Sequence, residues 1–298
     1  MDADGVKALA LQPRKPISAA MSTPFDLIVI GAGPAGLTVA TDAARAGLKT
    51  LCLDKLAPGG ALINLTQLHD VEEPTDGPQK ASQLADAATE AGVEIGFGEV
   101  VGFSGGDPWT VETAEGDRHV GRAVVVATGL NKGKLGIPGE ENYEGRGLSH
   151  CASCDGPLYA GQPVVVAGAD GWASHEAEEL KAFTGDITVV DNVERRIVAL
   201  EGNEGLNAVI VEAEGTRKTV PASAVFVYVN QSPAAEFVPD SLARDATGHI
   251  VVDEGGRTSV ASAFAAGDVR AGARQSLAAA IADGQRAARA VVSALAKV

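Results

Sequence analysis

Short apolar runs alternate with segments of helical periodicity over most of the chain, which is typical of an α/β protein. Residues 25–30 form a short run that is apolar except for Asp26, and such a run predicts a buried parallel strand. A glycine-rich turn follows, and apolar residues then recur with helical spacing from Leu37 to Ala44. Residues 49–53 predict a second strand, which ends at Asp54. This part of the chain therefore predicts a strand, a tight turn, a helix and a second strand.

The remaining pattern predicts more elements of the same two kinds. A helix is expected at residues 79–91. Strands are expected at residues 93–101, 109–113, 119–126 and 187–190. Residues 263–269 are strand-like, and a long alanine-rich helix is expected to start at Arg274-Gln275 and to run to the C-terminus. Alternating strands and helices favour a layered α/β fold with parallel strands.

Three glycines lie in the turn between the first strand and the first helix. Gly31, Gly33 and Gly36 have the spacing Gly-x-Gly-x-x-Gly, which permits a tight turn and the close approach of a pyrophosphate. The N-terminus of the following helix attracts the phosphate charge. Asp54 ends the next strand, where a carboxylate accepts hydrogen bonds from ribose hydroxyls. A turn without a ligand is the alternative, but the full context favours a dinucleotide site.

Glycine-containing turns occur near both ends of the chain. A Pro-Gly-Gly turn at residues 58–60 follows the first unit, and Gly267-Asp268 closes the strand-like segment near the C-terminus. One nucleotide held by both ends implies that the middle of the chain is an inserted domain. We therefore predict a dinucleotide-binding domain formed by residues 24–131 and 239–298. The insert is expected at residues 132–238, and residues 1–23 are expected to be a disordered leader.

Composition excludes several classes of protein. A chain of 298 residues has room for about two domains. The formal net charge of −15 argues against a nucleic-acid partner or an anionic membrane, because phosphate binding needs positive charge. No apolar run reaches the length that spans a bilayer. Only three cysteines are present, and two of them form one Cys-x-x-Cys pair, which predicts a cytoplasmic protein with a working disulfide.

That pair, Cys151 and Cys154, is followed at once by Asp155. A Cys-x-x-Cys pair can close a small disulfide ring, and one of its thiols is often unusually acidic. Asp155 can carry the proton that moves when the disulfide opens or closes. Half of a zinc site is the alternative, but it needs two more ligands; the only other cysteine is Cys52, which fits a buried apolar position, and the histidines are scattered. We therefore predict a redox pair and no metal.

Five motifs, taken together and in this order, resemble those of the low-molecular-weight thioredoxin reductases. They are residues 31–36, 127–129, 136–140, 151–156 and 265–270, the last followed by Arg274-Gln275. The resemblance covers most of the chain from about Phe25 onward. It implies a flavoprotein with two dinucleotide-binding (Rossmann-type) domains, in which the FAD domain is split by an insert that carries the disulfide and in this family binds NADPH. It also implies a homodimer that acts on a thioredoxin-like protein or on a small dithiol or disulfide substrate.

The resemblance also implies roles for single residues. The positions expected to contact FAD are Gly31, Gly33, Pro34, Ala35 and Gly36 at the pyrophosphate, Asp54 at the adenosine ribose, Asp268 at the ribitol, Arg274 and Gln275 beside the isoalloxazine, and Gly60, Ala61, Leu62, Asp70, Val101, Thr128, Gly129 and Gly267 along the rest of the cofactor. Two of these depart from the family pattern, which has a glutamine at Ala61 and an asparagine at Asp70. FAD binding is expected to survive both changes.

The same resemblance orders the cysteine chemistry. Cys154 is expected to face the flavin, Cys151 is expected to exchange with the external substrate, and Asp155 is expected to act as the acid–base group. His150 replaces an aromatic residue of the family pattern. It is expected to be a partly exposed loop histidine, with stabilisation of the Cys151 thiolate as the alternative.

The expected NADPH site departs from the family pattern in three ways. Asp170 replaces the second glycine of the inserted domain's own turn, where a carboxylate repels phosphate, and Trp172 adds bulk there. The arginine clamp for the 2′-phosphate is expected after the strand at 187–190, but Arg195 and Arg196 come four residues late and fit the start of a further strand. The insert is also short, as if a helix and a strand were missing. NADPH binding is therefore doubtful, with rescue by the two arginines as the alternative.

These patterns leave several readings of the function. We favour a thioredoxin-reductase-like enzyme that exchanges electrons between FAD and the disulfide without NADPH, with ferredoxin as a candidate donor, although docking acidic ferredoxins would need a local basic patch. A FAD-dependent dithiol oxidase of a small molecule that uses oxygen is an alternative. An ordinary NADPH-dependent thioredoxin reductase and a non-catalytic, flavin-bound regulatory protein are two more. Without NADPH, we expect the inserted domain to stay docked with Cys154 on the flavin.

Overall fold

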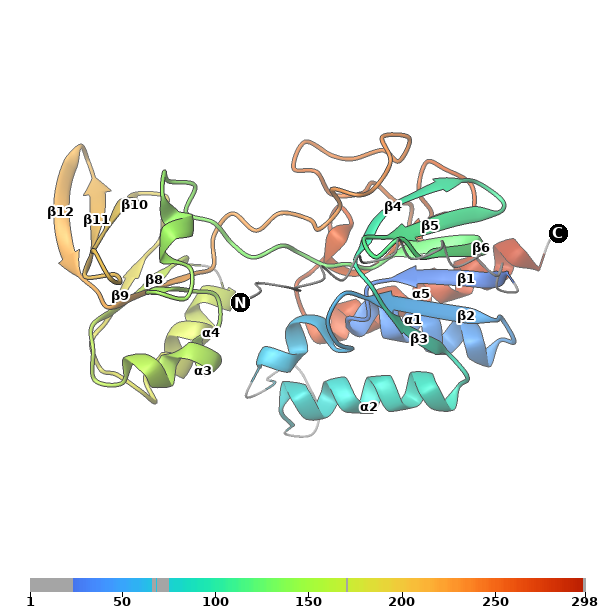
Figure 1. Cartoon of the computed structure of the whole chain (residues 1–298), viewed down its shortest axis with the longest axis horizontal. Coiled ribbons are helices and arrows are strands. Elements are labelled where there is room, and N and C mark those ends of the chain that lie inside the picture. Colours follow the sequence, from blue (N-terminus) through green and yellow to red (C-terminus); the bar gives the residue numbers. More distant parts are fainter. Residues whose placement is uncertain (1–23, 66–67, 69–74, 170, 297–298) are drawn as a thin grey trace, which may run out of the picture.

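The computed structural model describes residues 24–65, 68, 75–169 and 171–296. Asp70, Asp170 and the expected leader lie outside these described residues. The described chain forms two lobes that are joined by two extended connections (Figure 1). The connections run antiparallel beside each other, since Leu130 pairs with Pro233 and the backbone N–H of Lys134 donates to the carbonyl oxygen of Val229 at 2.9 Å.

The larger lobe is built on a seven-stranded sheet from both ends of the chain. Its strand order is β3-β2-β1-β6-β5-β4, and β14 pairs with β6 in addition. The elements are β1 (Phe25–Ile30), α1 (Pro34–Arg45), β2 (Thr50–Asp54), η1 (Gly60–Asn64), α2 (Gly77–Glu90), β3 (Glu94–Phe97), β4 (Val100–Gly105), β5 (Trp109–Thr113), β6 (Arg118–Val126), β14 (Ala263–Ala265), η4 (Gly267–Val269) and α5 (Leu277–Leu295). Strands β1, β2, β3, β6 and β14 pair in parallel, whereas β4 and β5 are antiparallel.

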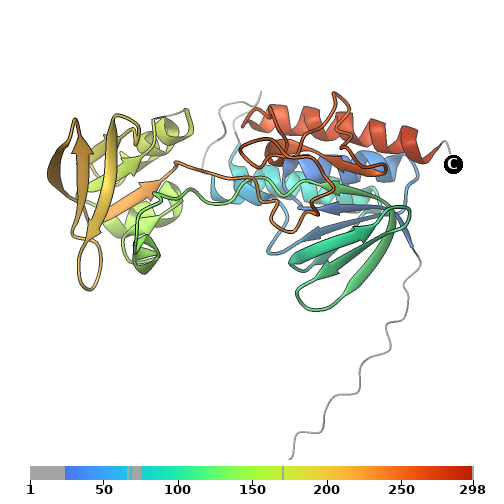
Figure 2. The ribbon, with the colours of Figure 1, turned by 90° about the horizontal axis from the view of Figure 1, so that it is seen from above.

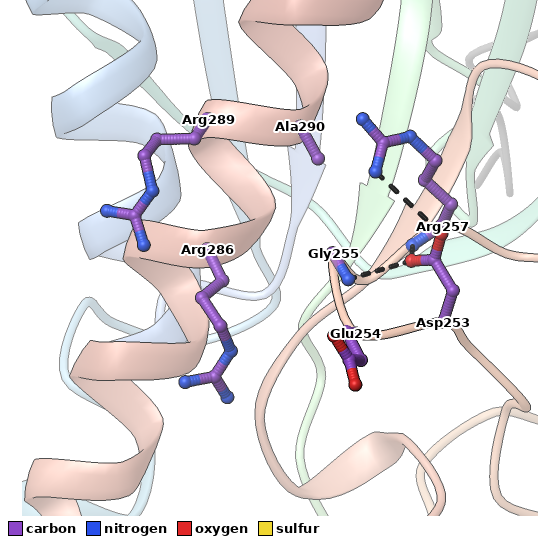
Figure 3. Close-up of a pocket in the computed structure, with 7 residues that line it drawn as sticks. All are labelled: Asp253, Glu254, Gly255, Arg257, Arg286, Arg289 and Ala290. Atoms are coloured by element: carbon purple, nitrogen blue, oxygen red, sulfur yellow. Dashed lines mark hydrogen bonds and ion pairs between the residues drawn. The ribbon is translucent and has the colours of Figure 1, made fainter.

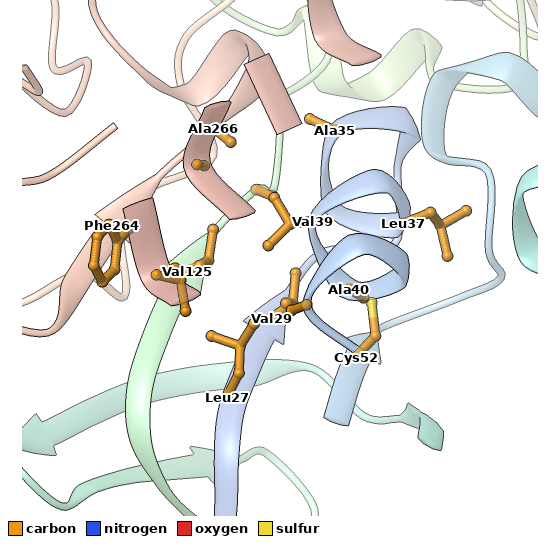
Figure 4. Close-up of a cluster of buried hydrophobic side chains, with 14 of the residues drawn as sticks. Leu27, Val29, Ala35, Leu37, Val39, Ala40, Cys52, Val125, Phe264 and Ala266 are labelled. Atoms are coloured by element: carbon orange, nitrogen blue, oxygen red, sulfur yellow. The ribbon is translucent and has the colours of Figure 1, made fainter. Parts of the chain in front are cut away.

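The two faces of β1 belong to two different cores, which explains its four consecutive apolar residues from Leu27 to Ile30. Leu27 and Val29 pack in one cluster with residues of α1 and α5 (Figure 4). Ile28 and Ile30 pack in the other cluster with Trp109 on β5 and its neighbours. The parallel strands therefore have helices on one face, and on the other the β4–β5 part of the same sheet packs together with residues 235–250. Figure 2 shows the helices and the β4–β5 hairpin on opposite sides of these strands.

The second lobe lies between the two extended connections. A four-stranded parallel sheet has the order β7-β13-β8-β9, and a three-stranded antiparallel sheet has the order β10-β11-β12. The elements are η2 (Glu140–Tyr143), β7 (Leu148–Ser149), α3 (Ala152–Asp155), η3 (Gly156–Tyr159), β8 (Val164–Ala167), α4 (Gly171–Leu180), β9 (Ile187–Val190), β10 (Arg195–Glu201), β11 (Ala208–Ala213), β12 (Thr216–Pro221) and β13 (Ala224–Val227). The prediction that Arg195 and Arg196 begin a strand is confirmed.

Two details of the element predictions were wrong. The single strand expected at residues 93–101 is two strands, β3 and β4, that separate at Gly98 (φ +155°). The backbone N–H of Gly98 donates to the carbonyl oxygen of Asp54, so the chain turns away from β2 there. The last helix starts at Leu277 rather than at Arg274, because the Ser276 hydroxyl accepts from the backbone N–H of Ala279 and caps it.

The predicted domain bounds stay predictions. The first predicted junction, between residues 131 and 132, falls within the paired connections. The second falls after Val238, and Ala235 and Val238 already pack in the core of the larger lobe. Among the described residues, no helix combines the length and the apolar character needed to cross a bilayer.

Candidate functional site

The three glycines of the turn after β1 have two different roles. A Cβ on Gly31, at φ +102°, would lie 2.5 Å from the carbonyl oxygen of Ala127, and one on Gly36 would lie 1.9 Å from the carbonyl oxygen of Gly31. A Cβ on Gly33 would meet no atom within 4 Å. Gly31 and Gly36 are therefore required by packing, whereas Gly33 borders open space at the N-terminus of α1, where a phosphate can approach.

Other predicted residues meet this turn from distant parts of the chain. Pro34 and Ala35 open α1, and a Cβ on Gly267 would lie 2.9 Å from the Cβ of Ala35. A Cβ on Gly60 would lie 3.1 Å from the Cα of Gly33. The turns before α1, in η1 and in η4 therefore converge on one place, as predicted for a nucleotide held by both ends of the chain.

Asp54 lies at the end of β2 beside the glycine turn. Its Oδ2 accepts from the backbone N–H of Ala32 at 2.8 Å, and its Oδ1 accepts from the backbone N–H of Leu56 at 2.9 Å. The backbone N–H of Gly98 donates to the carbonyl oxygen of Asp54, and β4 begins two residues later at Val100. Val101 on β4 is 53% exposed. Asp54 thus holds the turn in place at the position predicted for the ribose acid.

Thr128 and Gly129 follow β6 at the start of the first connection, and both hydrogen-bond to the second connection. The Thr128 hydroxyl donates to the carbonyl oxygen of Ala234 at 2.6 Å, and the backbone N–H of Ala234 donates to the carbonyl oxygen of Gly129 at 3.0 Å. In η1, Leu62 is buried in a small core with Leu277, and Ala61 is exposed. These residues position the two connections relative to the glycine turn.

The carboxylate of Asp268 on η4 has a buried oxygen without a partner among the described residues. Its Oδ1 makes no hydrogen bond, and burial, with the Asp283 carboxylate as the next cause, raises its pKa to about 6. An oxygen that is desolvated and unpaired is suited to a ligand hydroxyl, since burying a polar group without a partner is costly. The neighbouring Asp283 holds the segment, because its Oδ2 accepts from the backbone N–H of Gly267 at 2.7 Å and from Arg270 at 2.5 Å.

The residues of the glycine turn and of η4 fit the FAD that the sequence predicts. Gly33 leaves room for a phosphate, and Asp268 offers an unpaired acceptor. Arg274 and Gln275 are exposed and precede α5, so they are free to turn toward a bound ring. Asp70, the last of the predicted contacts, lies outside the described residues.

The Cys151 and Cys154 sulfurs are bonded to each other at 2.07 Å, across a short helix that begins directly after Cys151. Residues 151–154 contact the larger lobe at Asn64, the last residue of η1. The sequence did not predict a role for Asn64. The Asn64 carbonyl oxygen lies 3.8 Å from the Cys151 sulfur, and its side-chain Oδ1 lies 3.8 Å from the Cys154 sulfur. The disulfide therefore contacts the segment that carries the predicted cofactor residues Gly60 to Leu62.

Asp155 and His150 are placed by their own partners. The Ser149 hydroxyl donates to Oδ2 of Asp155 at 2.7 Å. His150 lies in a bend before the cysteine pair and is partly exposed, as expected. Its side chain is 11% exposed; its Nε2 lies 3.0 Å from Oε1 of Glu144, and its Nδ1 lies 3.4 Å from the carbonyl oxygen of Val227 at the end of β13.

Cys52, in contrast, is a buried residue of β2 in the helix-side core, as predicted. Burial, with Asp54 as the smaller cause, raises the pKa of its thiol to about 12. A thiol with so high a pKa stays protonated and is unreactive. The redox chemistry of the three cysteines is thus confined to the Cys151–Cys154 pair.

The region expected to bind NADPH has a different construction. Gly168 lies in the turn after β8, at φ +138°, and packs against Ala173; Asp170 lies outside the described residues. After β9, Oδ1 of Asp191 accepts from the backbone N–H groups of Val193, Glu194 and Arg195. These bonds, that from Val193 first, lower the pKa of Asp191, so a negative charge occupies the end of β9.

Comparison with known proteins gives a consistent result. The sequence family described as pyridine nucleotide-disulphide oxidoreductase matches residues 25–199 and 192–284. The thioredoxin reductase of Treponema pallidum is 33% identical over 301 residues, which cover 92% of this chain and 98% of that protein. Among solved structures, the thioredoxin reductase of Lactococcus lactis in its FR conformation superposes with a TM-score of 0.87 at 30% identity, covering 92% of this chain and 100% of that one. The thioredoxin reductase of T. acidophilum superposes with a TM-score of 0.84 at 28% identity, covering 91% of this chain and 98% of that one.

Proposed function

Because the chain belongs to the pyridine nucleotide-disulphide oxidoreductase family, and is a FAD-dependent disulfide oxidoreductase of the thioredoxin reductase type, we propose that it works without NADPH. The proposed reaction passes an electron pair between FAD and the Cys151–Cys154 disulfide, and between that pair and a thiol or disulfide substrate. The observation that carries the proposal is the Asp191 carboxylate at the end of β9, where the 2′-phosphate of NADPH would lie.

Asp191 excludes that phosphate by charge and by occupancy. Three backbone N–H groups that can bind an anion are already bonded to its own Oδ1. Arg195 does not rescue the phosphate, because its Nη1 donates to the carbonyl oxygen of Val189 at 3.1 Å. Arg196 follows on the same strand, paired with Glu212 of β11. Both arginines are thus residues of the antiparallel sheet. Their place in this sheet supports the proposal that the inserted lobe does not bind NADPH.

The disulfide chemistry needs few groups from the chain. FAD supplies two-electron chemistry when it is bound. Opening the disulfide takes two electrons and two protons and yields two thiols; closing it releases the same. Asp155 holds or returns a proton next to the pair, and the Ser149 hydroxyl fixes the orientation of its carboxyl group. Cys154 is the proposed partner of the flavin and Cys151 the proposed partner of the external substrate.

The donor that we infer is a small acidic redox protein, with a ferredoxin as the first to test. A chain of net charge −15 requires a local basic patch for such a partner. Arg270, Arg274 and Arg286 line a hollow of about 330 Å³ at the start of α5, next to η4. Arg286 and Arg289 also border a second hollow of about 500 Å³ with Arg257, together with two carboxylates (Figure 3). Arginine side chains thus gather beside η4 and along α5, where Arg270 and Arg286 also pair with Asp283.

The substrate we propose is a thioredoxin-like protein or a small dithiol or disulfide, acted on by a cytoplasmic homodimer. The sequence similarity to thioredoxin reductases supports the protein substrate. Ile63 precedes Asn64, which contacts the sulfurs, and Leu158 follows Cys154 by four residues. Their side chains are 40% and 70% exposed and offer apolar contact to a substrate.

Anaerobic titration of the flavin-loaded protein tests the proposal. We expect NADPH to leave the flavin absorbance unchanged within minutes, and a dithiol or reduced ferredoxin to bleach it. Rapid bleaching by NADPH would contradict the proposal and establish an ordinary reductase. Bleaching by a dithiol alone, with recovery in air, would instead establish a dithiol oxidase, and the absence of any response to thiols would establish a non-catalytic role.

A matched variant sharpens the same titration. Asp191→Gly removes the carboxylate at the end of β9 and frees its three N–H groups. We expect it to gain measurable NADPH binding, with the flavin site unchanged. The control is Asp245→Gly, because the Asp245 carboxylate also caps its own exposed loop, far from β9 in the sequence.

A further inference from the structure

A buried carboxylate is hydrogen-bonded to the backbone of the redox loop, next to Cys151. Glu176 on α4 is only 4% exposed. Its Oε2 accepts from the backbone N–H of Ala152 at 2.9 Å and from the Tyr228 hydroxyl at 2.6 Å. Ala152 follows Cys151 and opens α3. The carboxylate is therefore bonded to the peptide group that leaves Cys151, although it comes from a different helix.

None of the proton or electron transfers described above uses Glu176. A residue that only tied α4 to α3 would not need a charge, because an amide accepts the same two hydrogen bonds. A buried charge is retained at a cost, and such groups concentrate at functional sites. Glu176 therefore calls for an explanation beyond packing.

The groups around the disulfide leave Glu176 as a nearby negative charge. Burial raises the pKa of Tyr228, with the Glu176 carboxylate as the next cause, so Tyr228 remains a neutral hydrogen-bond donor. Asp155 is bonded to Ser149, and His150 is directed toward Glu144. Of the described side chains named here, His150 is the one that can become positively charged. It is already paired with the Glu144 carboxylate.

We propose that Glu176 is a positioning residue that lowers the reduction potential of the Cys151–Cys154 disulfide. Reduction adds two electrons and two protons, and one of the resulting thiols ionises to a thiolate for exchange. A fixed negative charge close by disfavours the thiolate and so the reduced pair, because like charges repel strongly where solvent is excluded. The disulfide form is then favoured, and the reduced pair becomes a stronger reductant. The effect belongs to the pair itself and holds whichever donor or substrate the enzyme uses.

The test is a redox titration of the cysteine pair in flavin-loaded protein. The protein is equilibrated anaerobically with mixtures of reduced and oxidised dithiothreitol, free thiols are trapped by alkylation, and the reduced fraction is measured by mass spectrometry. We expect Glu176→Gln to favour the reduced pair about tenfold, which equals about 30 mV for two electrons. The alkylation of Cys151 should also extend to lower pH. Glu178→Gln is the control, since Glu178 is exposed on the same helix, paired with Lys181, and loses the same charge.

A second variant keeps the proposal falsifiable if Glu176→Gln fails to fold. Tyr228→Phe leaves the carboxylate in place but removes the donor that partly neutralises it. Its midpoint should therefore shift in the opposite direction, toward the oxidised pair. Equal midpoints in wild type and both variants, or shifts of the same sign in both, would overturn the proposal. With Glu176→Gln unfolded, a Tyr228→Phe midpoint that is unchanged or shifted toward the reduced pair would overturn it alone.

Discussion

The hydroxyl of Ser153 donates a hydrogen bond of 2.6 Å to the backbone carbonyl oxygen of Asn64. Ser153 lies between the two redox cysteines, and Asn64 ends η1 of the other lobe, so this bond joins the lobes at the disulfide. The two sulfurs lie 3.8 Å from the same asparagine. Movement of the inserted lobe away from the larger lobe would therefore break this hydrogen bond and both sulfur contacts.

Removing this hydrogen bond should slow electron exchange between the lobes without changing the disulfide itself. We expect Ser153→Ala to slow the oxidation of reduced flavin by the disulfide several-fold, since a hydrogen bond of this kind contributes about 1 kcal/mol. Stopped-flow absorbance of the flavin measures the rate, and the dithiothreitol titration measures the potential, which should not move. An unchanged rate would show that the contact does not govern docking.

The two cysteines should fail in different ways. Cys154→Ser is expected to abolish electron exchange with the flavin, whereas Cys151→Ser should abolish turnover of external disulfides but leave one thiol next to the flavin. Turnover with a thioredoxin-like substrate and the flavin spectrum of each reduced variant distinguish the two. Cys52→Ala is the control, because the Cys52 thiol is buried and stays protonated. If Cys154→Ser and Cys151→Ser showed the same flavin spectrum and the same loss of turnover, the assigned roles would be contradicted.

Two glycines of the same turn should separate folding from cofactor binding. In Gly36→Ala, the new Cβ would lie 1.9 Å from the carbonyl oxygen of Gly31, so we expect a loss of stability of about 3 kcal/mol or more, in the range of severe core strain. In Gly33→Ala, the Cβ has free space, so the protein should fold normally but bind FAD at least tenfold more weakly. Thermal unfolding and flavin fluorescence measure the two effects. Normal FAD affinity in Gly33→Ala would contradict the predicted pyrophosphate position.

Asp268 should make the cofactor-free protein less stable as the pH rises. Its folded pKa of about 6 lies above the ordinary value of 3.8, so the folded state holds the proton more tightly than the unfolded state between these values. The free energy of unfolding should therefore fall as the pH increases from about 4 to 6, by about 1–2 kcal/mol. Asp268→Asn should remove this slope and weaken FAD binding. Urea unfolding at several pH values tests it, and a variant with an unchanged slope would sink the assignment.

Asp155 should matter for proton transfer more than for structure. We expect Asp155→Asn to lower turnover about 100-fold or more, as for other positioned acid–base groups, with the disulfide still formed. Ser149→Ala removes only the hydroxyl that orients the carboxyl group and should have a smaller effect. Steady-state turnover and a count of free thiols measure both. Turnover within twofold of wild type in Asp155→Asn would show that water carries the proton instead.

The sequence alone determined the features that depend on local spacing. Gly31, Gly33 and Gly36 mark a turn because only glycine tolerates the close contacts there, and the structure shows these contacts for two of the three. Cys151 and Cys154 pair because three residues of chain bring them together. The Rossmann-type pattern of the first strand and helix is likewise local, and the match to solved thioredoxin reductases confirms the fold.

Only the tertiary structure decided the features that join remote segments. Asn64, Asp283 and Glu176 carry no motif, and each acts on a residue far away in the chain: Asn64 on Ser153, Asp283 on Gly267 and Glu176 on Ala152. The break at Gly98 and the pairing of His150 with Glu144 also depend on neighbours that no local pattern identifies. Periodicity reports which face of a segment is buried, but the partner of a buried polar group is set by how whole elements pack.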